Sequence, residues 1–373
     1  MGQQYYSILN LLSEKAEYNL LLGERSNGKS YATKYCSLWE AYYEKDYFEH
    51  FKNKKDVQIK RYQLGYIRRW KDETKANDIE RYFDDMPIKD ITNNEYSIVI
   101  AYRNDIYFGN VDEKGKKIRG KKIGSVFAVN MATHYKSLSF PHIRNLIYEE
   151  FLTKDGYLAR EVENLTSIIS TIARREYVRV FLIGNSVNRY CPYFNEWELT
   201  HVKQQKIGTI DIYNQHTDQY DDSGNQIVVK IAVEYCANSG SNTKMFFGNK
   251  SKSITSGVWD TNTYPHLTDN LNTYKRLYQV KYIYNDFGFI IQLLKNVNNE
   301  PFLYVYPSTK ENSNVKRIVS NIHSIDVLTT YYLTELTKYD KLVLKLLNDN
   351  KVVYSDNLCG TEFNQIRKER GKF

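Results

Sequence analysis

The residues best suited to chemistry lie near the amino terminus, where Gly23 to Ser30 have the sequence GERSNGKS. This stretch matches the pattern GxxxxGK[ST], which joins a strand to a helix and surrounds phosphate groups in many nucleotide-binding proteins. Its glycines allow successive backbone N–H groups to converge on phosphate oxygens, and the following helix adds partial positive charge at its amino terminus. The stretch therefore predicts a nucleoside triphosphate site.

The positions of this motif have distinct expected contacts. Lys29 would neutralise the β- and γ-phosphates of ATP, and the Ser30 hydroxyl would bind Mg²⁺. Arg25 would reach the γ-phosphate or a neighbouring group, and a solvated arginine is the alternative. A glycine-rich turn without a ligand is the alternative for the whole motif. The predicted nucleotide contacts are Gly23, Arg25, Ser26, Asn27, Gly28, Lys29, Ser30 and Tyr31.

A pair of carboxylates, Glu149 and Glu150, follows the apolar residues Leu146–Tyr148. A site of this kind needs a second strand that ends in acid, the Walker B strand. Glu149 would hold Mg²⁺ together with Ser30, and Glu150 would polarise the attacking water as general base. The usual first residue is Asp, so the longer Glu149 leaves open which glutamate takes which role. An acidic strand end that faces solvent is the alternative.

Two weaker candidates involve a third apolar run and a basic helix end. Asn185 follows Val180–Gly184 and would contact the γ-phosphate or its water, although Asn is also a common turn former. Arg174 and Arg175 end a predicted helix, from which one subunit would offer an arginine finger to the ATP of the next. Cations are favoured at helix carboxyl termini in any case. The catalytic candidates are Glu150, Glu149, Asn185, Arg174 and Arg175.

The elements that must position these residues alternate between short apolar runs and helical patterns over residues 1–237. This alternation is typical of parallel strands joined by helices, so we expect an α/β, P-loop NTPase domain with a mainly parallel central sheet. The expected strands are Tyr18–Leu22, Gln63–Ile67, Ser97–Ala101, Ser125–Val129, Asn145–Tyr148, Arg179–Gly184 and Ile227–Glu234. The expected helices are Ser30–Tyr43, Ala76–Phe83 and Arg160–Glu176.

The basic stretch Asp112–Lys122 predicts a hairpin tip between strands at Ile106–Phe108 and Ile123–Val129. Its cations could touch DNA, but we favour a solvated hairpin. Residues 238–270 become rich in Ser, Asn, Gly and Lys, which predicts a linker.

Residues 271–373 are then expected to form a small α+β or α/β domain. Strands are expected at Leu277–Leu294 and Phe302–Val305, and helices at Ser324–Tyr332, Lys341–Leu347 and Asn364–Arg370.

Composition narrows the class of protein only slightly. The chain of 373 residues is 42% hydrophobic and carries a formal charge of +8, which suits transient contact with a polyanion. Its four cysteines lie far apart, so neither a zinc site nor a disulfide framework is expected. The amino-terminal residues lack the pattern of a signal peptide, and no apolar run is long enough to span a membrane. We expect an intracellular protein without a membrane partner.

The ordered set of motifs resembles the DNA-packaging ATPases of phi29-like phages, small relatives of the terminase large subunits. The two adjacent glutamates resemble the additional-strand, catalytic-glutamate branch of P-loop ATPases. The resemblance covers most of the chain and weakens after residue 235. It rests on Gly23–Ser30, Tyr66–Arg69, Lys136 with Pro141, Glu149–Phe151, Arg174–Glu176, Gly184–Val187 and Pro192–Phe194.

This resemblance implies ATP-driven translocation of double-stranded viral DNA into a procapsid, with ATP and Mg²⁺ as cofactors. It implies a homo-oligomeric ring, a homopentamer, docked on the portal or connector of the procapsid, and it leaves open a structural packaging RNA. The place of action would be the host cytoplasm, with transient residence at the portal vertex. Lys136 matches a lysine that acts across the subunit interface or near DNA, and Arg174 is nearest to a trans-acting arginine.

The resemblance also implies a carboxyl-terminal domain related to RNase H-type nucleases, which cut DNA with clustered carboxylates on two metal ions. No clear carboxylate set is found in this chain among Asp286, Asp326, Asp340 and Asp349. We therefore expect a vestigial nuclease-like domain that docks nucleic acid or the portal. Its candidate phosphate contacts are Lys310, Lys316 and Arg317.

Two other functions stay open at this point. One is a terminase large subunit whose carboxyl-terminal domain cuts DNA. The other is a non-motor module that binds a partner in its ATP-bound state.

Overall fold

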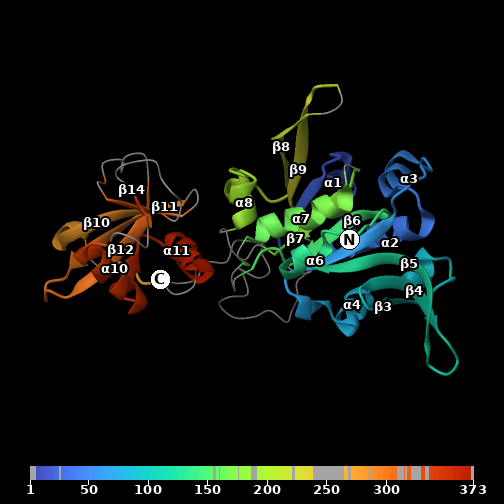
Figure 1. The fold of residues 1–373 in the computed structure, drawn as a ribbon, viewed down its shortest axis with the longest axis horizontal. Helices are drawn as coiled ribbons and strands as arrows, with labels where there is room; N and C mark the ends of the chain where they lie inside the picture. Colours follow the sequence, from blue (N-terminus) through green and yellow to red (C-terminus); the bar gives the residue numbers. More distant parts are fainter. Residues whose placement is uncertain are drawn as a thin grey trace, which may run out of the picture. The chain divides into compact units, whose positions relative to one another are not determined.

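The computed structural model describes residues 6–24, 27–153, 157–158, 160–174, 176–185, 191–220, 223–237, 264–267, 270–284, 287–308, 315, 317–320, 329–331 and 336–370. Within these ranges the chain forms two compact units, each built on its own sheet (Figure 1). None of the helices in this part of the chain is long and apolar enough to cross a membrane.

The first unit contains a nine-stranded sheet in the order β3-β4-β5-β2-β6-β7-β1-β9-β8. The six strands from β5 to β9 in this order are parallel to one another, whereas β3, β4 and β8 pair antiparallel at the two edges. A mixed α/β unit with a mainly parallel centre is therefore confirmed. The strands are β1 (Tyr18–Leu22), β2 (Gln63–Arg68), β3 (Ile98–Tyr102), β4 (Asp105–Val111), β5 (Lys117–Ala128), β6 (Ile143–Glu149), β7 (Arg179–Ile183), β8 (Thr209–Tyr220) and β9 (Gln226–Tyr235).

Helices cover both faces of this sheet. On one face, Leu11 of α1 and Cys36 of α2 share a buried cluster with Leu21 of β1 and Ile147 of β6. Successive strand residues point to opposite faces, so Tyr148 points away from this cluster. Its hydroxyl donates a hydrogen bond to Glu161 of α7, on the other face, over 2.8 Å.

The longest helices of the first unit are α2 and α7, and the others are short. The helices are α1 (Leu9–Ser13), α2 (Lys29–Tyr43), α3 (Tyr47–Asn53), α4 (Ala76–Phe83), α5 (Ile88–Ile91), α6 (Ala132–Tyr135), α7 (Glu161–Ala173) and α8 (Pro192–Glu196). Single 3₁₀ turns lie at Lys71–Thr74, Val129–Met131 and Val202–Gln204.

Most predicted elements of this unit are present, but the region around the basic hairpin differs. Strand β5 begins at Lys117, so the tip is limited to residues 112–116 and most of the predicted loop is strand. Most charged side chains of this segment are exposed and none is buried, so they do not prevent backbone pairing with β4. Strand β8 was not predicted, because its polar residues form an exposed edge strand.

The second unit contains a six-stranded sheet in the order β14-β13-β10-β11-β12-β15. Strands β10, β11 and β12 form an antiparallel meander, while β13 runs parallel to β10, β14 parallel to β13 and β15 parallel to β12. The elements are β10 (Lys275–Tyr284), β11 (Phe287–Lys295), β12 (Pro301–Pro307), β13 (Ile318–Ser320), β14 (Thr329–Tyr331), α10 (Lys338–Asn348), β15 (Val352–Tyr354) and α11 (Asn357–Arg370), with a 3₁₀ turn at Leu271–Thr273.

A predicted helix and the predicted linker of this part of the chain lie largely outside the described residues. The predicted helix Ser324–Tyr332 is wrong over Thr329–Tyr331, which pair as β14; its other residues lie outside the described ones. The predicted linker 238–270 also lies mostly outside them. Its described part packs on the second unit, since His266 forms a bridge with Tyr354 and the Tyr264 amide donates to Asn357.

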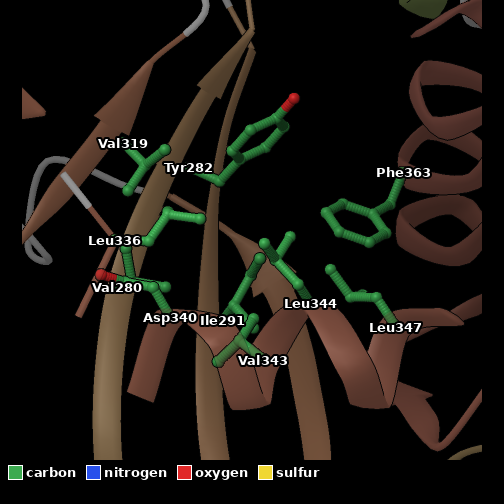
Figure 2. A pocket seen from close by; sticks show the side chains of 10 residues that line it. All are labelled: Val280, Tyr282, Ile291, Val319, Leu336, Asp340, Val343, Leu344, Leu347 and Phe363. Carbon is green, nitrogen blue, oxygen red and sulfur yellow. The ribbon is translucent and has the colours of Figure 1, made fainter. Parts of the chain in front are cut away.

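A small apolar cavity lies in the core of the second unit (Figure 2). Figure 2 shows Phe363 of α11 and Val343 of α10 pointing towards Ile291 and Val280 of the sheet. Its volume is about 30 Å³, roughly the space of one water molecule, so it is a packing gap rather than a ligand site.

Candidate active site

Some of the predicted site residues lie at the carboxyl ends of three neighbouring strands. The sheet order places β7 between β1, which leads into the glycine-rich loop, and β6, which ends at Glu149. These strands are parallel, so their carboxyl ends share one edge of the sheet. Polar groups in such a crevice converge on a ligand in many α/β proteins.

The glycine-rich loop requires two glycines in left-handed backbone conformations. Gly23 has φ 142° and Gly28 has φ 97°. A Cβ atom at Gly23 would lie 3.3 Å from the Cys236 carbonyl oxygen, so a side chain there meets both strain and crowding. Arg25 and Ser26 lie outside the described residues.

Lys29 is held inside this loop by two of its own residues. Its Nζ donates hydrogen bonds to the Glu24 carbonyl oxygen over 2.5 Å and to Asn27 Oδ1 over 3.1 Å. The side chain is buried, and burial lowers its pKa, partly offset by the nearby acidic groups Cys236 and Glu149. A buried ammonium group in a loop of backbone dipoles is suited to an anionic ligand.

The amino terminus of α2 provides further donors for an anion. Its N-cap is Gly28, which has no side chain to cap the helix, and its first turn has no acidic residue. The Nδ2 group of Asn27 is buried without a hydrogen-bond partner among the described residues. Unsatisfied donors at a helix amino terminus favour negative charge, and phosphate is a frequent ligand there.

Glu149 lies against the start of this helix. The Glu149 carboxylate accepts a hydrogen bond from Ser30 and another from the Tyr82 hydroxyl, the latter over 2.7 Å. Burial raises the pKa of Glu149, and these hydrogen bonds oppose that rise. The predicted approach of Ser30 and Glu149 is thus present in the geometry.

Tyr82 is a site residue that sequence analysis missed. It comes from α4, and its ring stacks on Tyr66 of β2 with centroids 4.5 Å apart. The ammonium group of Lys34 lies 4.6 Å from the centre of the same ring and donates to the Tyr82 carbonyl oxygen over 2.7 Å. Nothing in the local sequence marks this tyrosine, because its partner is 67 residues away.

Glu150 differs from its neighbour in both conformation and surroundings. Its φ of 57° is unusual for a residue other than glycine, and its side chain is 59% exposed. Its carboxylate pairs with Arg68 Nη2 at 3.0 Å, and the same arginine also pairs with Glu73. Glu150 therefore lies at the rim, beside the buried Glu149.

The remaining candidates are not all brought to this edge. Asn185 lies two residues beyond β7, between the strands that carry the loop and Glu149. Arg174 follows the last residue of α7, which lies at the amino ends of the strands. Arg61 shows this, because it donates to the carbonyl oxygens of the last α7 residues and also to that of Ile143, the first residue of β6. Arg174 therefore does not join Lys29 within one subunit.

Lys136 and Arg175 have different outcomes. Lys136 is exposed at the end of α6, near Arg174, whose guanidinium donates to the carbonyl oxygen of Leu138 over 2.8 Å. Arg175 lies outside the described residues. The structure thus places Lys136 with Arg174 and away from the loop.

A cavity of about 590 Å³ adjoins the loop at Gly28. Its lining includes Gly28, the exposed ring of Tyr31, and Tyr6, Tyr35 and Tyr47. Tyr31 and Tyr35 stack with centroids 6.4 Å apart. The volume falls within the range of about 300–1,000 Å³ that holds small molecules, and the walls are aromatic.

Several basic candidates outside this edge form ion pairs. In the hairpin, Lys117 pairs with Glu80, Lys121 with Glu44 and Lys122 with Asp105. All three lysines belong to β5, and none belongs to the hairpin tip at residues 112–116.

In the second unit, Arg317 pairs with Asp340, which also accepts from Tyr278 and caps α10. Asp349 is the carboxyl-terminal cap residue of the same helix. The other candidates, Lys310, Lys316, Asp286 and Asp326, lie outside the described residues. The described residues contain no group of three or more His, Cys, Asp or Glu side chains arranged for a metal ion.

Together these features define a mixed α/β protein with a glycine-containing loop and a buried carboxylate at the carboxyl ends of the parallel central strands. The chain belongs to the family of podovirus DNA encapsidation proteins (Gp16), whose model matches residues 2–225. The DNA packaging proteins of Bacillus phage PZA and Bacillus phage phi29 are each 26% identical to it over 196 residues. This match covers 51% of the chain and 49% of each relative, so the chain spans about half the length of the curated relatives it matches.

Two solved structures share the fold over nearly the whole chain. The phi-28 gp11 DNA packaging motor is 16% identical, with a TM-score of 0.52 and coverage of 98% of both chains. The bacteriophage phi-29 viral genome packaging motor assembly is 18% identical, with a TM-score of 0.54 and coverage of 98% of this chain and 99% of the other. At these identities the likeness establishes the fold alone.

Proposed function

We propose that this protein is an ATPase that drives double-stranded viral DNA into a phage procapsid. The observation that carries the proposal is the contact of Glu149 with Ser30 at the mouth of the loop that holds Lys29. Membership of the DNA encapsidation family supports the DNA-packaging part.

The residues present fit a Mg²⁺–ATP complex. The unpartnered Asn27 Nδ2, the buried Lys29 and the amino terminus of α2 are donors and positive charge suited to a triphosphate. Ser30 and Glu149 supply two hard oxygen ligands on the side of the loop that faces β6. Bound Mg²⁺ would neutralise charge on the phosphates, and Ser30 and Glu149 would hold it.

Glu150 is the proposed general base because it lies beside the metal-binding carboxylate yet remains open to water. In the present geometry its carboxylate pairs with Arg68 at 3.0 Å. It must leave this pair before it can accept a proton from the attacking water. Asn185, at the end of the intervening strand, is proposed to contact the γ-phosphate or this water.

The tyrosine-lined cavity fits the nucleoside part of ATP. It adjoins Gly28, so a nucleotide with its phosphates in the loop would direct its base into the cavity. Aromatic rings stack favourably on bases, and Tyr31 is the most exposed of the four tyrosines that line the cavity.

The strand order supports assignment to the P-loop NTPases with an additional strand. That strand is β7, which separates the loop-bearing β1 from the acidic β6. A γ-phosphate between these elements would contact three adjacent strands, so hydrolysis could alter their relative positions.

A ring of identical subunits, a pentamer on the procapsid portal, is proposed from the family. Arg174 and Lys136 lie together, away from the loop of their own subunit, which suits an action on the ATP or DNA at the next subunit. Contact with DNA would go through phosphates, independently of sequence. Such a motor would act in the host cytoplasm at the portal vertex, with or without a structural RNA.

The second unit is proposed to be a vestigial RNase H-like domain that docks nucleic acid or the portal. Its antiparallel meander, extended by two strands parallel to β10, is compatible with that fold. Asp340 is committed to Arg317 and the α10 cap, which supports loss of nuclease chemistry. Nicking of plasmid DNA with Mn²⁺ would instead favour an active terminase.

The test is ATP hydrolysis by the purified protein and by Glu150→Gln. We expect the variant to bind ATP normally and to turn over about tenfold or more slowly. Normal turnover by the variant would remove Glu150 from the base role. Turnover that DNA and procapsids leave unchanged would favour a non-motor binding module.

A further inference from the structure

Glu150 has a backbone conformation that its own residue type does not favour. Its φ of 57° is left-handed, and such a conformation at a residue other than glycine persists only where the surroundings hold it. The conformation determines where the Glu150 carboxylate points, because the chain turns sharply here after β6. The groups that fix this peptide therefore matter for catalysis.

Arg69 provides the contacts that hold this turn. Its Nη1 and Nη2 both donate to the Glu150 carbonyl oxygen over 3.2 Å, and Nη2 also donates to the Phe151 carbonyl oxygen over 2.9 Å. Arg69 follows β2, the strand next to β6, and is only 7% exposed. The planar guanidinium can bind two successive carbonyl groups at fixed angles, which an ammonium group cannot do.

A buried carboxylate fixes the guanidinium in turn. Glu161, in the first turn of α7, accepts from Arg69 Nε over 2.9 Å with its Oε2 atom, which also accepts from the Leu158 amide. Its Oε1 atom accepts from the hydroxyl groups of Tyr148 and Tyr193. The side chain of Glu161 is 0% exposed, so its hydrogen bonds form in a low-dielectric setting and restrict its movement.

We propose that Arg69 and Glu161 form a positioning pair, which sets the backbone at Glu150 so that its carboxylate reaches the water beside the nucleotide. Neither side chain touches substrate in this proposal, which rests on the proposed ATPase function. The pair also connects the start of α7 to the turn at Glu150. A shift of α7 would therefore move Glu150 through these hydrogen bonds.

A double-mutant cycle on ATP hydrolysis tests the pair. Arg69→Lys keeps the charge beside Glu161 but cannot bind both carbonyl groups. We expect it to lower kcat about tenfold or more, with less than about a threefold change in the Kd of a fluorescent ATP analogue. In a Glu150→Gln background, the same substitution should change kcat less than about twofold, because the carboxylate it positions is already absent.

The matched control is Arg61→Lys. Arg61 also donates to backbone carbonyl groups of β6 and α7, but at their opposite ends, through Ile143, Ile172 and Ala173. This variant should keep kcat within about a factor of two of wild type. An equal loss of kcat in both arginine variants would point to general packing and overturn the proposal.

Two other outcomes would also overturn it: unchanged kcat in Arg69→Lys, or the same fold loss with and without Glu150→Gln. If Arg69→Lys fails to fold, Glu161→Gln replaces it in the cycle, since it keeps the volume and an acceptor for Arg69. Failure of the proposed function looks different, because wild type would then not hydrolyse ATP or Glu150→Gln would retain full activity.

Discussion

Replacement of Glu40 by Gln should destabilise the first unit strongly. Glu40 lies in α2, the helix that begins with Lys29, and its side chain is 0% exposed. Its Oε2 atom is bound by Arg179 and accepts from Asn145 over 2.7 Å, and Arg144 Nε lies 3.3 Å from it. These residues belong to β6 and β7, so Glu40 fixes α2 to the strand that ends at Glu149 and to its neighbour.

The expected magnitude follows from the charges left behind. Loss of one partner from a buried, hydrogen-bonded ion pair costs about 3–5 kcal/mol. The lower end applies here, because Arg179 keeps its 2.9 Å hydrogen bond to Asn145 and Gln can still accept. About 3 kcal/mol in a domain of this size lowers Tm by roughly 6–12 °C.

Thermal and denaturant unfolding, followed by circular dichroism, measure this effect. Glu44→Gln, just beyond the same helix, is the control, since Glu44 is 41% exposed and pairs with Lys121 at the surface. Its loss should cost less than about 1 kcal/mol. A Glu40→Gln loss no larger than that of the control would refute the buried-charge argument.

Two further predictions concern the nucleotide. Burial lowers the pKa of Lys29. Its positive charge is present below that pKa, so as the pH rises the charge is lost at a lower pH than for an ordinary lysine. In the alkaline range, the ATP affinity of the wild-type protein should therefore fall as the pH rises, whereas that of Lys29→Arg should stay constant. Titration with a fluorescent nucleotide measures both affinities, and a constant wild-type affinity would refute the prediction. Tyr31→Ala should weaken ATP binding about fivefold to thirtyfold but leave inorganic tripolyphosphate binding unchanged in competition assays, with the exposed Tyr220→Ala as control. Equal weakening of both ligands would exclude a role for Tyr31 at the base.

The sequence predicted those parts of the site that depend on local patterns. The loop at 23–30 and the carboxylates at 149–150 each follow an apolar run, and parallel pairing brings such strand ends to one edge. The central strands were predicted for the same reason, because buried strands are nearly continuous apolar runs. The first half of β5, Lys117–Lys122, and the edge strand β8 lack that pattern, since most of their side chains are polar and not buried.

The supporting contacts were out of reach because they join distant positions. Tyr82 binds Glu149 across 67 residues, and Arg69 binds Glu161 across 92. Neither partner has a local motif, and each side chain would be unremarkable at a solvated surface. The wrong helix prediction at Thr329–Tyr331 has another cause: these β-branched and aromatic residues favour a strand, which they form beside β13, and the helical pattern read across them did not weigh that preference.

The proposed nucleotide site is best checked by a structure of the protein with Mg²⁺ and a slowly hydrolysed ATP analogue. We expect phosphates within the loop at Lys29, the metal between Ser30 and Glu149, and the base against Tyr31. Nucleotide bound elsewhere, or a metal that neither Ser30 nor Glu149 approaches, would contradict it.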